Sequence, residues 1–244
     1  MIRGLRPLVV SHRTQMGTAP ENTIAGIDAA LADGVDGIEI DVRATADGAL
    51  VLLHDDTLER TVEDPRRLAD VERAELHALA VRDPYGRLGA QPIPTLEEAL
   101  ERIDGRAILV IELKEHGLEE RVAALVRARD AASWCWIWCF MPEVVAAARE
   151  ALPEVPGWLN WSARTAELRG AADPVEVARR IGAAGISVQY GDVDAGLVER
   201  ARRRGLLTAT WTVNERADLE RVRDAGVDAI CGDFPDRTIA ALSA

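Results

Sequence analysis

Short apolar runs alternate eight times with amphipathic, alanine-rich segments along this chain of 244 residues. This alternation is typical of βα units around a parallel sheet. The runs expected to form strands cover residues 8–11, 36–42, 107–113, 134–140, 157–161, 185–190, 206–213 and 229–232. Eight strands that are each followed by a helix favour closure into a barrel over an open sheet, and one such barrel needs about 250 residues. The sequence therefore predicts an α/β fold, a (β/α)₈ TIM barrel.

Two features interrupt the regular alternation. A ninth apolar run, residues 49–54, is joined to the second strand by a predicted turn at residues 45–48. The stretch that follows, residues 55–94, is too long for a simple connection between a strand and a helix. We therefore expect residues 1–244 to form a single barrel domain, with a small insertion after the second strand region at about residues 55–94.

The net charge of the chain is −12. This charge argues against nucleic acid or an anionic membrane surface as the main partner. No apolar run is long enough for an integral membrane segment, and the first residues lack the apolar stretch of a secretory leader. The sequence thus favours a cytoplasmic protein with a small-molecule substrate, and it leaves the oligomeric state open.

Acidic side chains recur at the ends of two predicted strands, where the loops of a barrel build its active site. Glu39 and Asp41 lie two residues apart in the second strand, and Glu112 and Lys114 do so in the third. Residues at i and i+2 of a strand point to the same face, so the three carboxylates can converge at the barrel mouth. Because three buried anions need a strong cation, and oxygen ligands suit hard ions, the pattern predicts one divalent cation, Mg²⁺ or Ca²⁺.

Two histidines also stand at predicted strand ends, His12 after the first strand and His54 after the ninth run. An ordinary pKa near 6.5 allows histidine to be either an acid or a base at neutral pH. His12 and His54 are therefore candidates for a catalytic acid/base pair, whereas His77 and His116 are interpreted as packed or surface residues.

The charges of the predicted site fit a phosphodiester anion. Glu39, Asp41 and Glu112 carry three negative charges, and Arg13 and Lys114 carry two positive ones. A divalent cation would turn the sum from −1 to +1, which matches one phosphodiester. Lys114 is the only lysine among 29 basic residues, so a bias towards arginine does not explain it.

Several motifs of the chain resemble those of the glycerophosphodiester phosphodiesterase family. They are His12-Arg13 with Ala19-Pro20-Glu21-Asn22-Thr23, Gly37-Ile38-Glu39-Ile40-Asp41-Val42, Asp47-Gly48, Leu53-His54-Asp55, Ile93-Pro94-Thr95-Leu96-Glu97-Glu98, Ile111-Glu112-Leu113-Lys114, Trp211-Thr212-Val213-Asn214, Gly226-Val227-Asp228 and Asp233-Phe234-Pro235. The motifs follow one another in order and span nearly the whole chain. The family usually has glycine directly after His-Arg, and here Thr14 takes that place.

The resemblance implies a barrel that hydrolyses glycerophosphodiesters to glycerol 3-phosphate and an alcohol. It further implies a role for each matching residue. His12 and His54 would be the acid/base pair, Glu39, Asp41 and Glu112 the metal ligands, Arg13 and Lys114 the phosphate contacts, and Trp211 a packing surface for glycerol.

Two other functions stay open on the sequence. One is a barrel enzyme similar to the spider-type sphingomyelinase D phospholipases, and the other is a catalytically silent phosphate-binding protein. The presence of both histidines with all three carboxylates argues against the second. We also expect Trp134, Trp136, Trp138 and Phe140, which alternate along one strand, to pack as core against the helices.

Overall fold

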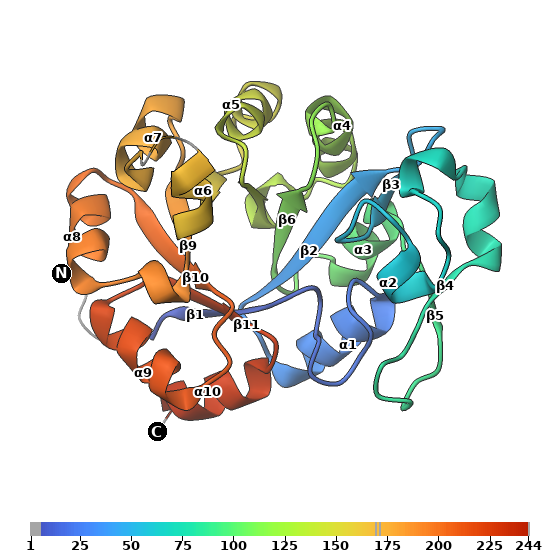
Figure 1. Ribbon diagram of the computed structural model, residues 1–244, viewed down its shortest axis with the longest axis horizontal. Coiled ribbons are helices and arrows are strands. Elements are labelled where there is room, and N and C mark those ends of the chain that lie inside the picture. Colours follow the sequence, from blue (N-terminus) through green and yellow to red (C-terminus); the bar gives the residue numbers. More distant parts are fainter. Residues whose placement is uncertain (1–5, 169, 171, 244) are drawn as a thin grey trace.

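The computed structural model describes residues 6–168, 170 and 172–243, and within them eight parallel strands close into a barrel with helices outside (Figure 1). The order around the barrel is β1-β11-β10-β9-β8-β7-β6-β2, and β2 pairs with β1 to close it. The strands are β1 (Leu8–Ser11), β2 (Gly37–Ala44), β6 (Ile108–Leu113), β7 (Cys135–Cys139), β8 (Gly157–Trp161), β9 (Gly185–Gln189), β10 (Leu207–Trp211) and β11 (Ala229–Gly232). The predicted (β/α)₈ TIM barrel is confirmed.

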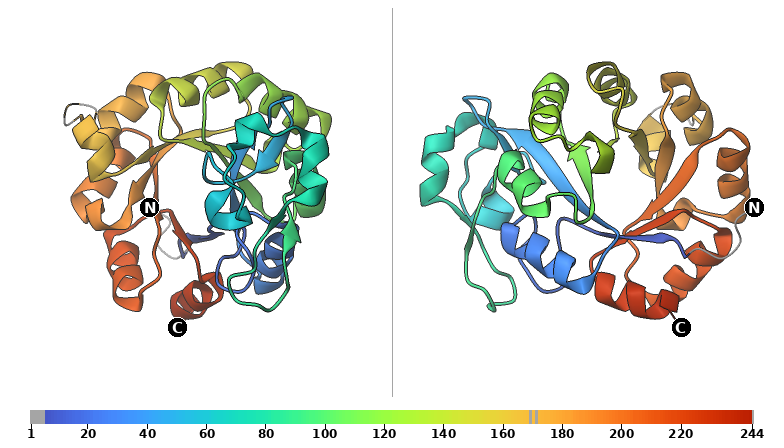
Figure 2. Two further views of the ribbon diagram at one scale, coloured as in Figure 1. Left: turned by 45° about the vertical axis from the view of Figure 1, so that its right-hand side comes forward. Right: turned by 180° about the vertical axis from the view of Figure 1, so that it is seen from behind.

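The helices surround the barrel in both views of Figure 2. They are α1 (Ile24–Asp33), α3 (Leu96–Ile103), α4 (Glu119–Ala128), α5 (Pro142–Ala151), α6 (Ala163–Leu168), α7 (Pro174–Ile181), α8 (Ala195–Arg203), α9 (Arg216–Ala225) and α10 (Pro235–Ser243). Local signals fix several ends. Thr23 caps α1 by accepting from the Gly26 backbone N–H, and Thr95 forms a capping box with Glu98 at α3. The main hydrophobic core lies between these helices and the outer face of the barrel.

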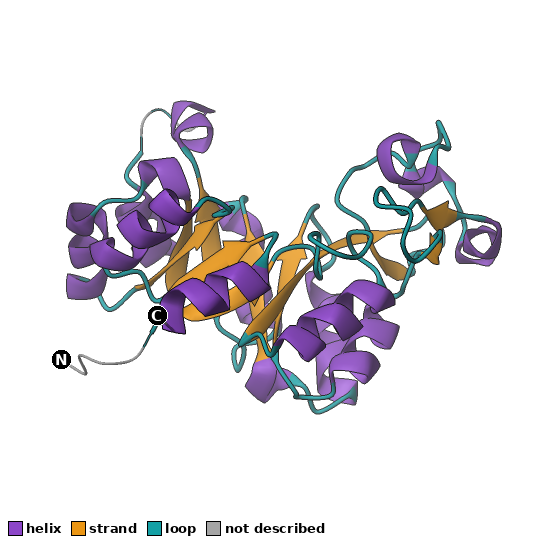
Figure 3. Cartoon of the chain, turned by 90° about the horizontal axis from the view of Figure 1, so that it is seen from below, coloured by secondary structure: helices purple, strands orange, loops and turns teal. Residues whose placement is uncertain are grey.

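The ninth apolar run forms β3 (Leu50–Leu52), which pairs antiparallel with β2. The segment after it contains α2 (Glu59–Val62), two 3₁₀ helices at Leu68–Asp70 and Arg73–Ala78, and the paired strands β4 (Ala80–Val81) and β5 (Gln91–Pro92). In Figure 3 this segment lies at one end of the molecule, beyond the helices that cover the barrel. It has a hydrophobic cluster of its own, centred on residues such as Leu58, Leu68 and Val71. We propose that it is an insertion within one barrel domain.

The barrel interior holds two aromatic residues of β7 and one of β8. Trp138 and Trp158 belong to a cluster inside the barrel, with their ring centroids 6.2 Å apart. Trp136 stacks on Trp158 at 5.0 Å. The expectation that the aromatic residues of β7 pack against the helices is therefore wrong for Trp136 and Trp138, because both faces of a barrel strand are buried and alternation alone cannot tell them apart.

None of the helices in the described part of the chain has the length and apolarity needed to cross a membrane.

Candidate active site

Three acidic side chains meet at the barrel mouth, two from the middle of β2 and one from the carboxyl end of β6. Asp41 and Glu112 stand side by side in the register of these strands, and Glu39 lies two residues before Asp41. One carboxylate oxygen from each of the three lies within 4.8 Å of the others. All three residues are buried, with 2 %, 1 % and 8 % exposure for Glu39, Asp41 and Glu112. The predicted convergence of Glu39, Asp41 and Glu112 is thus present in the structure.

Burial and mutual repulsion strain this cluster electrostatically. Burial, together with the charges of Asp41 and Glu112, holds the pKa of Glu39 well above its usual range. Burial also acts to raise the pKa of Asp41, but Lys114, His54 and Arg13 outweigh it and lower that pKa to about 2. The donor set therefore fits a divalent cation, which would stabilise all three anions at once.

Lys114 lies inside the same cluster. Its Nζ atom is 2.6 Å from Glu112 Oε1 and 3.3 Å from Asp41 Oδ1. Asn160, on β8, donates from Nδ2 to the other oxygen of Glu112 at 3.0 Å. Asn160 was not predicted, although an amide in the middle of the apolar strand β8 was a usable signal.

The loop between β1 and α1 places Arg13 over the carboxylates. The Arg13 backbone N–H donates to Glu39 Oε2 at 2.7 Å, and Arg13 Nε is 3.5 Å from Asp41 Oδ2. Asn22 locks Asp41 from the same loop, because its Nδ2 donates to Asp41 Oδ2 at 2.7 Å and its Oδ1 accepts from the Asp41 backbone at 3.0 Å. This loop thus connects the first motif of the chain to the acidic cluster.

Each of the two predicted histidines has a carboxylate partner at Nδ1. His12 Nδ1 is 2.6 Å from Asp233 Oδ1, and His54 Nδ1 is 2.7 Å from Asp55 Oδ1. Asn214 holds the other oxygen of Asp233 at 2.7 Å. Such a partner fixes the ring orientation and leaves Nε2 as the atom for proton transfer.

The environment of His54 favours its neutral form. Burial lowers the pKa of His54, and the positive charges of Lys114 and Arg13 lower it further against the opposing effect of Asp41.

A cavity of about 140 Å³ opens between these groups. The predicted site residues that line it are His12, Arg13, Glu39, Asp41, His54, Glu112, Lys114 and Trp211. Phe140 lines it as well and packs edge-on against Trp211, with ring centroids 5.4 Å apart. The expectation that Phe140 packs as core against the helices is therefore wrong, because Phe140 is part of the cavity wall. All eight predicted site residues are brought together.

Thr14, which stands where the resemblance leads one to expect glycine, keeps a glycine-like backbone. Its φ is 74° and its side chain is buried. A β-branched residue in this left-handed region is strained by about 1–2 kcal/mol. The side chain packs so closely on α1 that a Cβ atom added at Gly26 would overlap Thr14 Oγ1. The threonine at position 14 therefore needs a residue without a side chain at position 26.

This packing predicts a compensating pair. We expect Gly26→Ala to destabilise the chain by about 2 kcal/mol through overpacking. In a Thr14→Gly background, Gly26→Ala should lower the free energy of unfolding by at least about 1 kcal/mol less than it does in the unmodified protein. The reason is that the obstructing Thr14 side chain is gone and alanine is a better helix former than glycine. Urea unfolding of the two single variants and the double variant measures this coupling. Additive effects within about 0.5 kcal/mol would show that the two side chains do not oppose each other.

The fold and the site together define a (β/α)₈-barrel protein with a buried acidic cluster that could hold a divalent metal at the barrel mouth. Residues 12–237 match the profile of the glycerophosphoryl diester phosphodiesterase family, and the chain belongs to that family. It is accordingly an enzyme, a phosphoric diester hydrolase.

Individual relatives support this assignment. A glycerophosphodiester phosphodiesterase of Caldanaerobacter subterraneus is 31 % identical over 242 residues, which cover 96 % of this chain and 97 % of the relative. The crystal structure of a glycerophosphodiester phosphodiesterase from Agrobacterium tumefaciens is 29 % identical, with a TM-score of 0.82 over 96 % of this chain and 99 % of that one. A phosphodiesterase from Oleispira antarctica, solved with the product sn-glycerol-3-phosphate, is 28 % identical, with a TM-score of 0.85 over 98 % of each chain.

Proposed function

We propose that this chain hydrolyses glycerophosphodiesters to glycerol 3-phosphate and an alcohol, with one divalent cation and two histidines. The observation that carries this proposal is the cavity at the barrel mouth. Two histidines with carboxylate partners line this cavity. The basic side chains of Arg13 and Lys114 and three buried carboxylates line it as well. The relative from Oleispira antarctica, which binds sn-glycerol-3-phosphate, supports a small phosphorylated substrate.

Glu39, Asp41 and Glu112 would hold the cation, Mg²⁺ or Ca²⁺, because three carboxylates form a hard oxygen donor set. When bound, the cation supplies Lewis-acid polarisation of the phosphate and neutralises the excess negative charge. In this proposal Arg13 and Lys114 contact the phosphate oxygens and Trp211 packs against the glycerol carbons, and it is supported by the position of all three in the cavity lining.

The two histidines divide the proton transfers. The neutral form of His54, favoured by its lowered pKa, suits the base that takes a proton from the attacking hydroxyl. His12 then gives a proton to the leaving oxygen as the phosphorus–oxygen bond breaks, so that the alcohol departs neutral. When water attacks, glycerol 3-phosphate forms in one step. When the substrate's own glycerol hydroxyl attacks, the alcohol leaves and a cyclic phosphate forms, which a water must then open with His12 as the base and His54 as the acid.

Release of glycerol 3-phosphate from glycerophosphocholine by the purified protein tests this function. We expect turnover with an added divalent cation, and no product release under any cation would refute it. A route similar to that of the sphingomyelinase D phospholipases would be recognised by a cyclic phosphate as the end product.

Lys114 allows a specific test of the phosphate contact. Its ammonium lies between Glu112 and Asp41 with 12 % of the side chain exposed, so there is little room for the wider fork of arginine. We expect Lys114→Arg to be nearly as damaging as Lys114→Ala, with the loss mainly in kcat, because the ammonium stabilises charge on the phosphorus oxygens. Steady-state kinetics of the two variants measure this.

Burial acts to lower the pKa of Lys114, but Glu112 and Asp41 outweigh it and raise that pKa, so the amine stays a charged ammonium at neutral pH. A Lys114→Arg variant with wild-type turnover would show that the phosphate contact needs only a positive charge at this position.

A further inference from the structure

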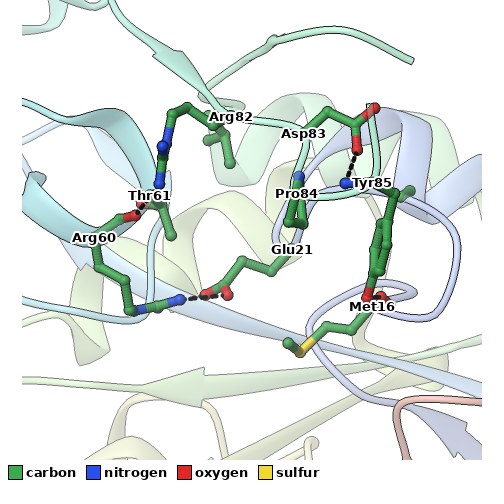
Figure 4. Close-up of a pocket in the computed structure, with 10 residues that line it drawn as sticks. Met16, Glu21, Arg60, Thr61, Arg82, Asp83, Pro84 and Tyr85 are labelled. Carbon is green, nitrogen blue, oxygen red and sulfur yellow. Dashed lines mark hydrogen bonds and ion pairs between the residues drawn. The ribbon is translucent and has the colours of Figure 1, made fainter. Parts of the chain in front are cut away.

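Arg60, in α2 of the insertion, joins two carboxylates that come from different parts of the chain. Its Nε is 2.5 Å from Asp55 Oδ2. Its Nη1 and Nη2 are 2.7 Å and 2.7 Å from the two oxygens of Glu21 in the loop between β1 and α1. Figure 4 shows the Arg60 and Glu21 side chains pointing toward each other in a cavity of about 530 Å³. A bidentate pair of this kind fixes the geometry of both partners.

Each of the two carboxylates also contacts a residue of the proposed site. Asp55 Oδ1 is 2.7 Å from His54 Nδ1, and Glu21 Oε1 is 3.2 Å from Arg13 Nη1. Glu21 is nearly enclosed, with 9 % of its side chain exposed. The chain of contacts His54–Asp55–Arg60–Glu21–Arg13 therefore runs without a break from the proposed base to the proposed phosphate contact.

The backbone that carries Arg60 is anchored independently of these contacts. Leu58, at the start of α2, is fully buried in the hydrophobic cluster of the insertion. The Thr61 carbonyl accepts from the Arg82 backbone N–H at 2.8 Å. The guanidinium therefore reaches both carboxylates from a backbone segment that is anchored without them.

We propose that Arg60 is a positioning residue that orients His54 and Arg13 at the same time, through Asp55 and Glu21. The inference rests on the proposed roles of His54 and Arg13. If Arg60 does not bind Glu21, the Glu21 carboxylate can draw Arg13 away from the phosphate. If Arg60 does not bind Asp55, the Asp55 carboxylate can turn together with the His54 ring. A displacement of about 1 Å at a reacting group can lower the rate about 100-fold.

The stability of the chain should depend little on Arg60. Its side chain is 47 % exposed, and its buried partner Glu21 keeps a second ion pair with Arg13 when Arg60 is removed, so no buried charge is left without a partner. An effect of Arg60 on catalysis can therefore be separated from an effect on folding.

The chain offers a matched control for this test. Arg66 also lies in the insertion, is 40 % exposed, and joins Asp64 and Glu75 at 2.7 Å and 2.7 Å. It makes the same type of two-carboxylate contact, but neither of its partners belongs to the proposed site. Arg60→Gln and Arg66→Gln thus each remove one positive charge and its contacts with two carboxylates.

We expect Arg60→Gln to lower kcat and to raise KM for glycerophosphocholine, each by about tenfold or more, with little change in Tm. Arg66→Gln should leave both constants near those of the unmodified protein. Asp55→Asn should act mainly on kcat, since it releases His54, and Glu21→Gln mainly on KM, since it releases Arg13. Arg60→Lys should recover only part of the loss, because an ammonium cannot reproduce the three contacts of the guanidinium.

Several results would overturn the inference. They are kinetic constants of Arg60→Gln equal to those of Arg66→Gln, a change confined to kcat or to KM, or a loss of Tm with both constants intact. If Arg60→Gln does not fold, the separate effects of Asp55→Asn and Glu21→Gln decide the question. Activity retained in His54→Ala and Arg13→Ala would instead refute the proposed function. Activity lost in those variants but kept in Arg60→Gln would refute only the role of Arg60.

Discussion

Exhaustive chelation of divalent cations is expected to abolish diester hydrolysis and to lower the Tm of this protein. Glu39, Asp41 and Glu112 lie within 4.8 Å of one another in a buried site. Without a cation their mutual repulsion is opposed mainly by Lys114 and Arg13, so both substrate binding and the folded state should weaken. If the ion binds only the folded state, a free ion concentration of about 100 times its Kd would stabilise the folded protein by about 2.7 kcal/mol.

Re-addition experiments extend this prediction to the type of ion. Mg²⁺ or Ca²⁺ should restore activity and Tm together, whereas Zn²⁺ should not restore activity, because the donor set consists of carboxylates without a histidine or thiolate. A Glu39→Gln variant is the control, since it should respond less to re-addition. Full activity after chelation would sink the proposal of a metal site.

Replacing either proposed catalytic histidine should lower kcat about 100-fold or more, the usual contribution of a positioned acid or base. His12 and His54 both line the cavity, and each is held at Nδ1 by a carboxylate. Because their side chains are partly exposed at the barrel mouth, at 17 % and 30 %, His12→Ala and His54→Ala should keep their secondary structure and nearly their Tm.

His77 supplies the control for the histidines. It is exposed and lies in the insertion, in the 3₁₀ helix at Arg73–Ala78, so His77→Ala should keep the activity of the unmodified protein. Near-normal turnover in either His12→Ala or His54→Ala would show that the acid/base assignment is wrong.

The fold could be predicted because each βα unit carries its own local signals. The strands β1, β8 and β11 have the expected bounds, and the other barrel strands differ from them by one or two residues, as at β2, where residues 36–42 were expected and Gly37–Ala44 is found. The segment from 55 to 94 was harder to predict. Its short elements depend on packing around Leu58, Leu68 and Val71, and the apolar residues of this segment follow no helical or strand period that would predict these elements.

The site could be predicted as far as it follows from strand geometry. Glu39 with Asp41, and Glu112 with Lys114, obey the two-residue period, and the parallel register of β2 and β6 brings the two pairs together. Phe140 was assigned to the wrong face because both faces of a barrel strand are apolar.

The contacts around Arg60 lay beyond sequence reasoning for another reason. Arg60 and Glu21 are 39 residues apart in the chain, and only the tertiary fold places one against the other. Asp233 and Asp55 could have been suspected as partners of His12 and His54, since both follow the ends of predicted strands.

The most direct test of the central claim, that this site is a metal-dependent glycerophosphodiesterase, is phosphorus NMR of glycerophosphocholine turnover with and without a divalent cation. The account predicts that the diester signal is replaced by that of glycerol 3-phosphate when Mg²⁺ or Ca²⁺ is present, and that it persists after chelation. A transient cyclic phosphate that is then opened would identify the substrate's own hydroxyl as the attacking group. Conversion that proceeds equally well without a cation, or a diester signal that persists under every cation, would contradict the account.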